Sequence, residues 1–100
     1  MLNVIRHASK KIWSGEILNE EFLLPPGISA YRLAKETSIP INRVTSIIKG
    51  TRSISADTAI RLGKFFETSP QFWLGLQNDF DIEEKLLKEV FLKRFITTKS

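Results

Sequence analysis

Apolar residues along the chain recur at intervals of three and four positions, and they do not alternate as they would in an exposed β-strand. Short runs rich in proline, glycine and serine separate the apolar segments. The pattern predicts an all-α domain of five to six helices. We expect a first helix over Glu16–Leu24, a second from Ser29, a third from Pro40 or Ile41 to Gly50, a fourth capped by Ser55, a fifth starting with Ser69 and Pro70, and a helical segment over Ile82–Phe95.

The helix boundaries come from residues with a known preference for helix ends. Serine accepts hydrogen bonds from the first free amides of a helix, and proline suits its first position. Glycine favours the left-handed conformation that ends a helix, as expected at Gly50. The apolar stripes then predict the core, which comprises Ile17, Leu18, Phe22, Leu23, Leu33, Ala34, Val44, Ile47, Ile48, Ile60, Leu62, Phe65, Phe66, Phe72, Trp73 and Leu76.

The chain divides into three parts. Residues 1–13 have no clear period and predict an arm, with Ile12 and Trp13 docked on the body. Residues 14–78 form the domain, and residues 79–100 form a C-terminal helix with a broad apolar stripe. This helix either serves dimerisation, packs back on its own core or frays as a tail. The pattern leaves open whether Asp79–Asp81 breaks it.

Residues 30–49 have the spacing of a helix-turn-helix unit. A small residue, Ala34, lets the second helix cross close to the first, and Ser38 occupies the turn four positions later. Val44 and Ile47 point back into the core, which leaves the opposite face of the second helix free to enter a DNA major groove. If Ser38 has a positive φ, it costs up to roughly 1 kcal/mol relative to the glycine usual at this place.

The free face carries short polar and cationic side chains that can bond base edges or phosphates. Asn42 is a candidate for pairing with adenine, Thr45 for contact with a thymine methyl, and Arg43 for guanine or a phosphate. Backbone contacts are expected from the end of the helix, the loop after it and the start of the preceding helix. The predicted DNA-binding residues are Tyr31, Arg32, Asn42, Arg43, Thr45, Ser46, Lys49, Thr51 and Arg52.

The distribution of charge supports this interpretation. The 100 residues carry a formal net charge of +4, and the excess lies in residues 29–52, where five basic residues meet one acid, Glu36. A local basic patch indicates a polyanionic partner, whereas chance clustering on a solvated surface is the alternative. Because the patch coincides with the helix-turn-helix spacing, DNA binding is favoured.

Composition argues against most enzymes. The chain has no cysteine and a single histidine, His7, so thiolate chemistry and His- or Cys-ligated metal sites are not expected. Glu16, Glu20 and Glu21 share a short helix without a basic partner and are interpreted as a solvated face. We expect no catalysis, no metal and no cofactor. No apolar run approaches the ~18 residues of a membrane helix, and the start lacks a secretory signal, so a cytoplasmic protein is expected.

Several sequence blocks resemble a known family. The run Leu33–Ile39 (LAKETSI) is similar to the first half of the Cro/C1-type, lambda-repressor-like helix-turn-helix domain. More narrowly, the chain resembles the HigA-type antitoxins, also called virulence-associated protein I. This likeness is carried by residues 15–18 and 21–23, by residues 51–59 with 61–62, and by residues 69–77 (SPQFWLGLQ), in that order over about residues 14–82.

The resemblance implies an antitoxin of a type II toxin-antitoxin pair. Such a protein binds the operator of its own operon as a homodimer, represses it, and neutralises a RelE/HigB-type toxin that cuts messenger RNA. Residues 1–28, neutral overall, are a candidate toxin-docking arm. Two alternatives stay open: a stand-alone Cro/C1-type regulator without a toxin, and a protein-interaction module that has lost DNA binding.

Overall fold

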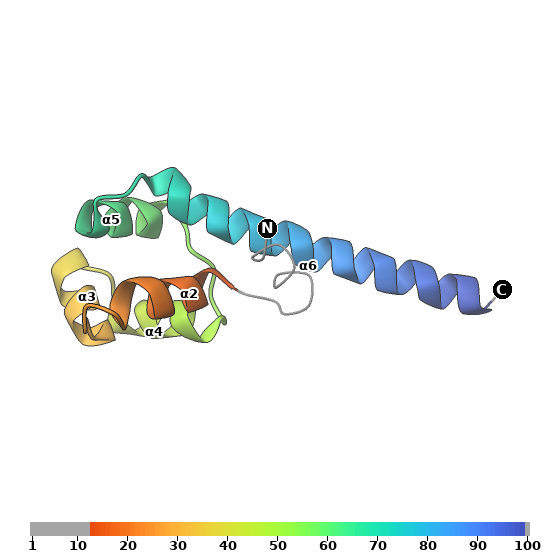
Figure 1. Cartoon of the computed structure of the whole chain (residues 1–100), viewed down its shortest axis with the longest axis horizontal. Coiled ribbons are helices and arrows are strands. Elements are labelled where there is room, and N and C mark those ends of the chain that lie inside the picture. Colours follow the sequence, from red (N-terminus) through yellow and green to blue (C-terminus); the bar gives the residue numbers. More distant parts are fainter. Residues whose placement is uncertain (1–12, 100) are drawn as a thin grey trace.

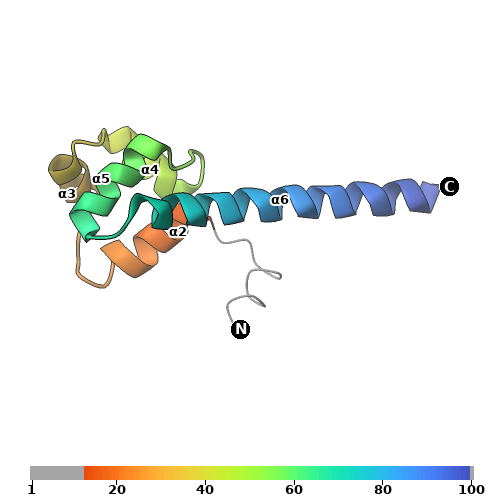
Figure 2. The same ribbon diagram turned by 90° about the horizontal axis from the view of Figure 1, so that it is seen from above.

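The computed structural model describes residues 13–99, with side chains through Val90 and at Leu92. In this part of the chain all regular structure is helical. A compact group of short helices forms a head, from which the last helix projects as a long rod (Figures 1 and 2). The elements are α2 (Ser14–Ile17), the π-helix η1 (Leu18–Leu23), α3 (Ala30–Thr37), α4 (Ile41–Lys49), α5 (Ala56–Phe66) and α6 (Pro70–Lys99).

The predicted serine caps are confirmed. The side chain of Ser29 accepts a hydrogen bond from the amide of Arg32 at 3.0 Å. The Ser55 hydroxyl accepts one from the amide of Thr58 at 3.3 Å, and that of Ser69 accepts one from the amide of Phe72 at 3.2 Å. Each bond lies within three residues of the helix start, which explains why the local sequence predicts these boundaries.

The first helix differs from its prediction over Glu16–Leu24. It begins two residues earlier, where the carbonyl of Trp13 accepts the amides of Glu16 and Ile17. It then widens into η1, and the amide of Leu24 reaches the carbonyl of Asn19, five positions back, at 2.9 Å. Prolines 25 and 26 cannot continue the ladder, so the helix ends there.

Asp79–Asp81 does not interrupt the C-terminal helix, because α6 is continuous from Pro70 to Lys99. The carboxylate of Asp81 accepts a hydrogen bond from the Gln77 side-chain amide, four residues earlier, at 2.9 Å. Its side chain therefore bonds along the helix and does not cap a new one. Over residues 13–99 no helix is both long and apolar enough to cross a membrane.

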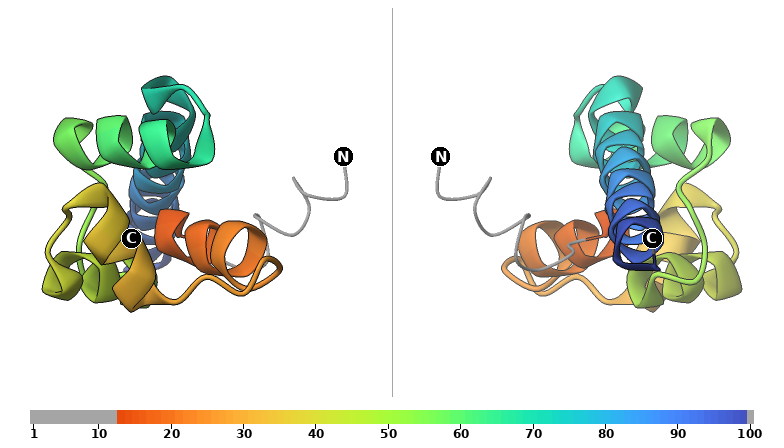
Figure 3. Two further views of the ribbon diagram at one scale, coloured as in Figure 1. Left: turned by 90° about the vertical axis from the view of Figure 1, so that its left-hand side faces the viewer. Right: turned by 90° about the vertical axis from the view of Figure 1, so that its right-hand side faces the viewer.

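Trp73 is the largest fully buried side chain of the core. Its indole nitrogen donates to the Thr68 hydroxyl at 2.7 Å, so its one polar atom is paired. Helices α2 and α5 pack against α6, and seen along this rod the short helices lie on more than one side of its axis (Figure 3). The remaining buried apolar residues come from η1, α3, α4 and α5 and from the α3–α4 and α4–α5 loops: Leu18, Leu23, Leu33, Ala34, Ile39, Val44, Ile47, Ile54, Ala59 and Leu62.

Two core predictions fail at the edge of this cluster. Ile60 is 45% exposed and Phe72 is 39% exposed. Helix α5 packs through Thr58, Ala59, Leu62 and Gly63, which turns Ile60 toward solvent. Phe72 instead packs against the outside of the core, with its ring centroid 5.0 Å from that of Trp73.

Helices α2 and α4 approach each other closely at Gly15. A Cβ atom at this position would overlap the main-chain carbonyl of Ile47, whereas a Cβ on Gly75 in α6 would meet nothing within 4 Å. The backbone of Ile47 lies within a helix and cannot move aside as a flexible side chain would. The absence of a side chain at Gly15 is therefore what permits this packing.

We predict that Gly15→Ala destabilises the fold by about 1–3 kcal/mol or more through overpacking. Gly75→Ala, the matched control, should be neutral or stabilise by up to about 1 kcal/mol, because alanine has the higher helix propensity. Urea unfolding followed by circular dichroism measures both. Equal stability of the two variants would contradict the close approach of α2 and α4.

Candidate nucleic-acid interface

The α3–α4 unit has the helix-turn-helix geometry that the sequence predicts. Ser38 is left-handed, with φ 61° and ψ 26°, so the strain expected for a serine at this turn is present. Ala34 is buried, and Val44 and Ile47 are each 1% exposed on the inner face of α4. The four positions that define the spacing therefore occupy their expected places.

A buried threonine holds the turn between the two helices. The Thr37 hydroxyl donates to the carbonyl of Leu33 at 2.6 Å and accepts from the amide of Ile39 at 3.3 Å. The Thr37 side chain thus bonds one main-chain carbonyl of α3 and one main-chain amide of the segment that follows it. The direction in which α4 leaves α3 is thereby fixed.

The outer face of α4 presents the predicted contact residues to solvent. Asn42 and Lys49 are exposed, while Thr45 and Ser46 are half-buried. The Thr45 hydroxyl donates to the carbonyls of Ile41 and Asn42, at 3.1 Å each, so its proton is used within the helix. No side chain caps the start of α4, and the first amides of a helix have no partner within it.

The loop after α4 is held from two sides. Gly50 is left-handed as predicted, with φ 85°, and the amide of Thr51 donates to the carbonyl of Ser46 at 2.9 Å. The Trp13 indole donates to the carbonyl of Ile48 at 2.8 Å, and its ring lies against Gly50. The predicted docking of Trp13 is thus confirmed, whereas Ile12 and His7 lie outside the described residues.

Gln77 of α6 holds the other end of this loop. Its buried side-chain oxygen accepts the Ser14 hydroxyl at 2.7 Å and the main-chain amide of Ile54 at 3.0 Å. One amide therefore joins α2, the α4–α5 loop and α6. The loop that carries the exposed Thr51 and Arg52 is therefore held by Trp13 on one side and by Gln77 on the other.

At the start of α3 the remaining predicted contacts lie on the surface. Tyr31 is 69% exposed. The Arg32 side chain is 57% exposed, and its Nε donates to the Glu36 carboxylate at 2.8 Å, one turn along the same helix. The five cations of the basic window all lie on α3, on α4 or in the loop after α4.

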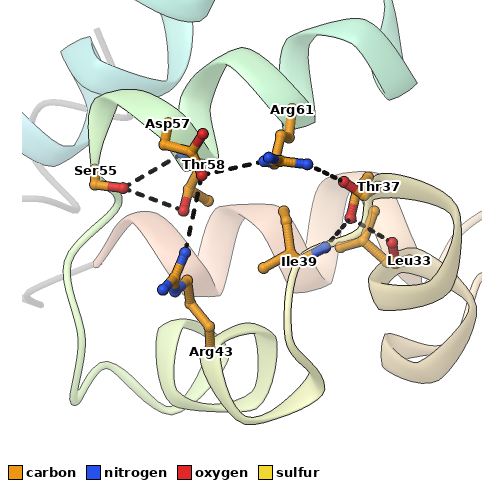
Figure 4. A network of polar contacts seen from close by, with 8 residues as sticks. All are labelled: Leu33, Thr37, Ile39, Arg43, Ser55, Asp57, Thr58 and Arg61. Atoms are coloured by element: carbon orange, nitrogen blue, oxygen red, sulfur yellow. Dashed lines mark hydrogen bonds and ion pairs between the residues drawn. The ribbon is translucent and has the colours of Figure 1, made fainter.

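Arg43, also on α4, is paired with an acid of another helix. Only 32% of it is exposed, and its Nη1 lies 3.9 Å from the carboxylate of Asp57 at the start of α5 (Figure 4). The same carboxylate accepts the Nε of Arg61 at 3.1 Å. The spacing of Asp57 and Arg61 on one helix favours their pair, whereas Arg43 and Asp57 lie on different helices and meet only in the folded chain.

Among residues 13–99 no three His, Cys, Asp or Glu side chains gather where they could hold a metal ion. Glu16, Glu20 and Glu21 lie on α2 and η1, where Glu20 and Glu21 are exposed and Glu16 is half-buried. The grouping of polar and cationic side chains on α3 and α4 is instead suited to a polyanion.

Comparison with protein families matches residues 20–73 to the helix-turn-helix family. Virulence-associated protein I of Dichelobacter nodosus is 43% identical over 72 residues, 72% of this chain and 67% of that protein, about two-thirds of its length. An addiction module antidote protein of the HigA family from Coxiella burnetii has a similar structure, with a TM-score of 0.75 and 49% identity, over 89% of this chain and 94% of that one. The Pseudomonas aeruginosa antitoxin HigA, solved with the higBA promoter, gives a TM-score of 0.78 and 38% identity over 83% of this chain and 90% of that one.

Proposed function

The chain belongs to the HigA family of helix-turn-helix antitoxins, and on this premise we propose that it binds the operator of its own operon as a homodimer and represses transcription. We further propose that it neutralises a RelE/HigB-type toxin that cleaves messenger RNA, and that it does so in the cytoplasm. Proteins of this family are DNA-binding regulators and not enzymes.

One observation carries the operator function: the inner face of α4 is buried while its outer face presents short polar and cationic groups beside the basic window. The likeness to a HigA structure solved with promoter DNA supports the same proposal. Base contacts are assigned to the start of α4, because recognition helices read bases with their N-terminal residues. Asn42 pairs with adenine, Arg43 with guanine, and the Thr45 methyl packs on thymine.

Phosphate contacts surround this centre. Lys49 at the end of α4, Ser46 one turn before it, and Thr51 and Arg52 in the loop bind the DNA backbone on one side. Tyr31 and Arg32 at the start of α3 bind it on the other. Phosphate contacts set affinity and orientation, whereas base contacts set sequence preference.

The two kinds of contact respond differently to substitution. We predict that Asn42→Ala costs about 1–3 kcal/mol on the operator and relaxes preference at one base pair of each half-site. Lys49→Ala should weaken binding to all sequences about equally. Fluorescence anisotropy with the DNA upstream of the gene measures both, at several salt concentrations.

In the same titration, the three cations assigned to phosphate in each subunit, Arg32, Lys49 and Arg52, give a dimer a log–log salt slope of about −5. A slope near zero, or equal affinity for upstream and unrelated DNA, would contradict the operator function.

The projecting part of α6 is the proposed dimerisation element. Its apolar residues are largely exposed, with Ile82 50%, Leu86 55% and Val90 54% accessible in the single chain. Spaced four apart, they form one stripe along the rod, outside the core. Trp73, at the start of the same helix, is fully buried in the head and does not contribute to this surface. Helix-turn-helix proteins read two DNA half-sites that lie about one turn of the DNA double helix apart. Binding both half-sites therefore requires two heads held together in one dimer.

We predict that Leu86→Asp combined with Val90→Asp gives a monomer, because two carboxylates would be buried in the paired stripe. The head should retain its unfolding temperature, since neither side chain belongs to its core. Leu92→Asp, on the other side of the helix by its 100° spacing, is the matched control and should remain dimeric. Light scattering distinguishes the states, and an intact dimer in the double variant would refute the assignment.

Toxin neutralisation is the part of the function that separates an antitoxin from a stand-alone regulator. The family supports it, and the N-terminal segment, residues 1–28, is the proposed docking arm. For an antitoxin we expect a small reading frame for a basic protein beside the gene, and we expect that protein to copurify with this chain. A stand-alone Cro/C1-type regulator has no such neighbour.

A further inference from the structure

The carboxylate of Asp57 lies between two arginines that come from different helices (Figure 4). Its Oδ2 atom is 3.1 Å from Nε of Arg61, one turn along α5, and 3.9 Å from Nη1 of Arg43 on α4. The Asp57 side chain is 59% exposed. Exposed ion pairs contribute little to folding stability. The main effect of this arrangement is therefore on the positions of the charged side chains.

Arg61 holds the carboxylate in place from the other side. Its Nη1 donates to the main-chain carbonyl of Thr37 at 3.1 Å, at the last residue of α3. The side chain of Thr37 is itself bonded on both sides of the turn. The carboxylate of Asp57 is thus tied, through Arg61, to the helix-turn-helix turn as well as to α5.

Arg43 is the residue that this arrangement restrains. It is the third residue of α4, in the part of a recognition helix that reaches base edges. Arg32, another cation of the basic window, also has an acidic partner, Glu36. Both residues of that pair lie on α3, so the pair does not connect two helices. Arg43 is paired across two helices, and less of its side chain is exposed than of the Arg32 side chain, 32% against 57%.

A carboxylate beside a guanidinium has two effects on DNA binding. It restricts the guanidinium to fewer orientations, which lowers the entropy lost when the arginine forms two parallel hydrogen bonds with a guanine edge. It also offsets part of the positive charge, which weakens attraction to any phosphate. Both effects raise the preference for one sequence relative to DNA in general.

We propose that Asp57 is a specificity-determining residue, which positions Arg43 for reading one guanine in each half-site and lowers its affinity for unrelated DNA. The proposal rests on the operator function proposed above. Asp57 itself is assigned no contact with DNA. Its role is exerted through Arg43, and Arg61 is the support that keeps the carboxylate in reach.

The test uses the full chain and a panel of upstream DNA duplexes, each with one base pair changed. Arg43→Ala first locates the base pair at which discrimination is lost. Asp57→Asn is then expected to lower discrimination at this same base pair by about tenfold, the order expected for a bidentate contact, and to bind unrelated DNA more tightly than the unaltered protein.

Glu36→Gln is the matched control. It also removes one negative charge, in this case within the basic window, but Glu36 pairs with Arg32 on its own helix and not with a residue of α4. Its effect should be equal on all duplexes. If Glu36→Gln lowers discrimination at the Arg43 base pair as much as Asp57→Asn does, general charge is responsible and the proposal is overturned.

A double substitution separates positioning from a merely structural role. When Arg43→Ala is already present, adding Asp57→Asn should change discrimination at that base pair no further. If Asp57→Asn lowers discrimination by the same factor with and without Arg43, it acts by another route and the proposal is overturned. Thermal unfolding of each variant checks that the head remains folded, as expected for an exposed carboxylate.

The two proposals fail in different ways. Unaltered protein that binds upstream and unrelated DNA equally would overturn the operator function and, with it, the role of Asp57. The role of Asp57 alone would be overturned if the unaltered protein prefers the upstream DNA and the Asp57→Asn variant discriminates among the duplexes as strongly as the unaltered protein does.

Discussion

Burial of the inner face of α4 is the constraint on which the rest of the structure depends. Val44 and Ile47 are almost completely inaccessible, and Gly15 brings α2 against the backbone of Ile47. With this side of a nine-residue helix covered by its neighbours, the polar side is left facing solvent. The left-handed turn at Ser38 is needed for the same reason, because it directs α4 across α3 so that these side chains reach the core.

The surface proposed to meet DNA is stabilised by parts of the chain that are far away in sequence. Trp13 lies against the loop after α4, and Gln77 of α6 bonds the amide of Ile54 at the end of that loop. The same Gln77 bonds Ser14 and Asp81. Helix α6 therefore links the head to its exposed apolar stripe, so that pairing of two rods would fix the separation of two heads.

Features set by neighbours in sequence could be predicted, whereas those set by packing could not. The caps at Ser29, Ser55 and Ser69 depend on amides three residues away, and the turn depends on a fixed spacing of four positions. Ile60 was wrongly assigned to the core, because periodicity defines an apolar stripe without showing which edge of it meets other helices. The Arg43–Asp57 pair joins residues fourteen positions apart on separate helices. Neither residue carries a local signal for it.

The central claim is that α4 enters the major groove of the operator, and probing of guanine N7 with dimethyl sulfate tests it most directly. Guanine N7 lies in the major groove, and adenine N3 lies in the minor groove. We predict that the protein protects guanine N7 in two clusters about 34–36 Å apart in the upstream DNA. Protection of adenine N3 alone, with guanine N7 fully reactive, would contradict it.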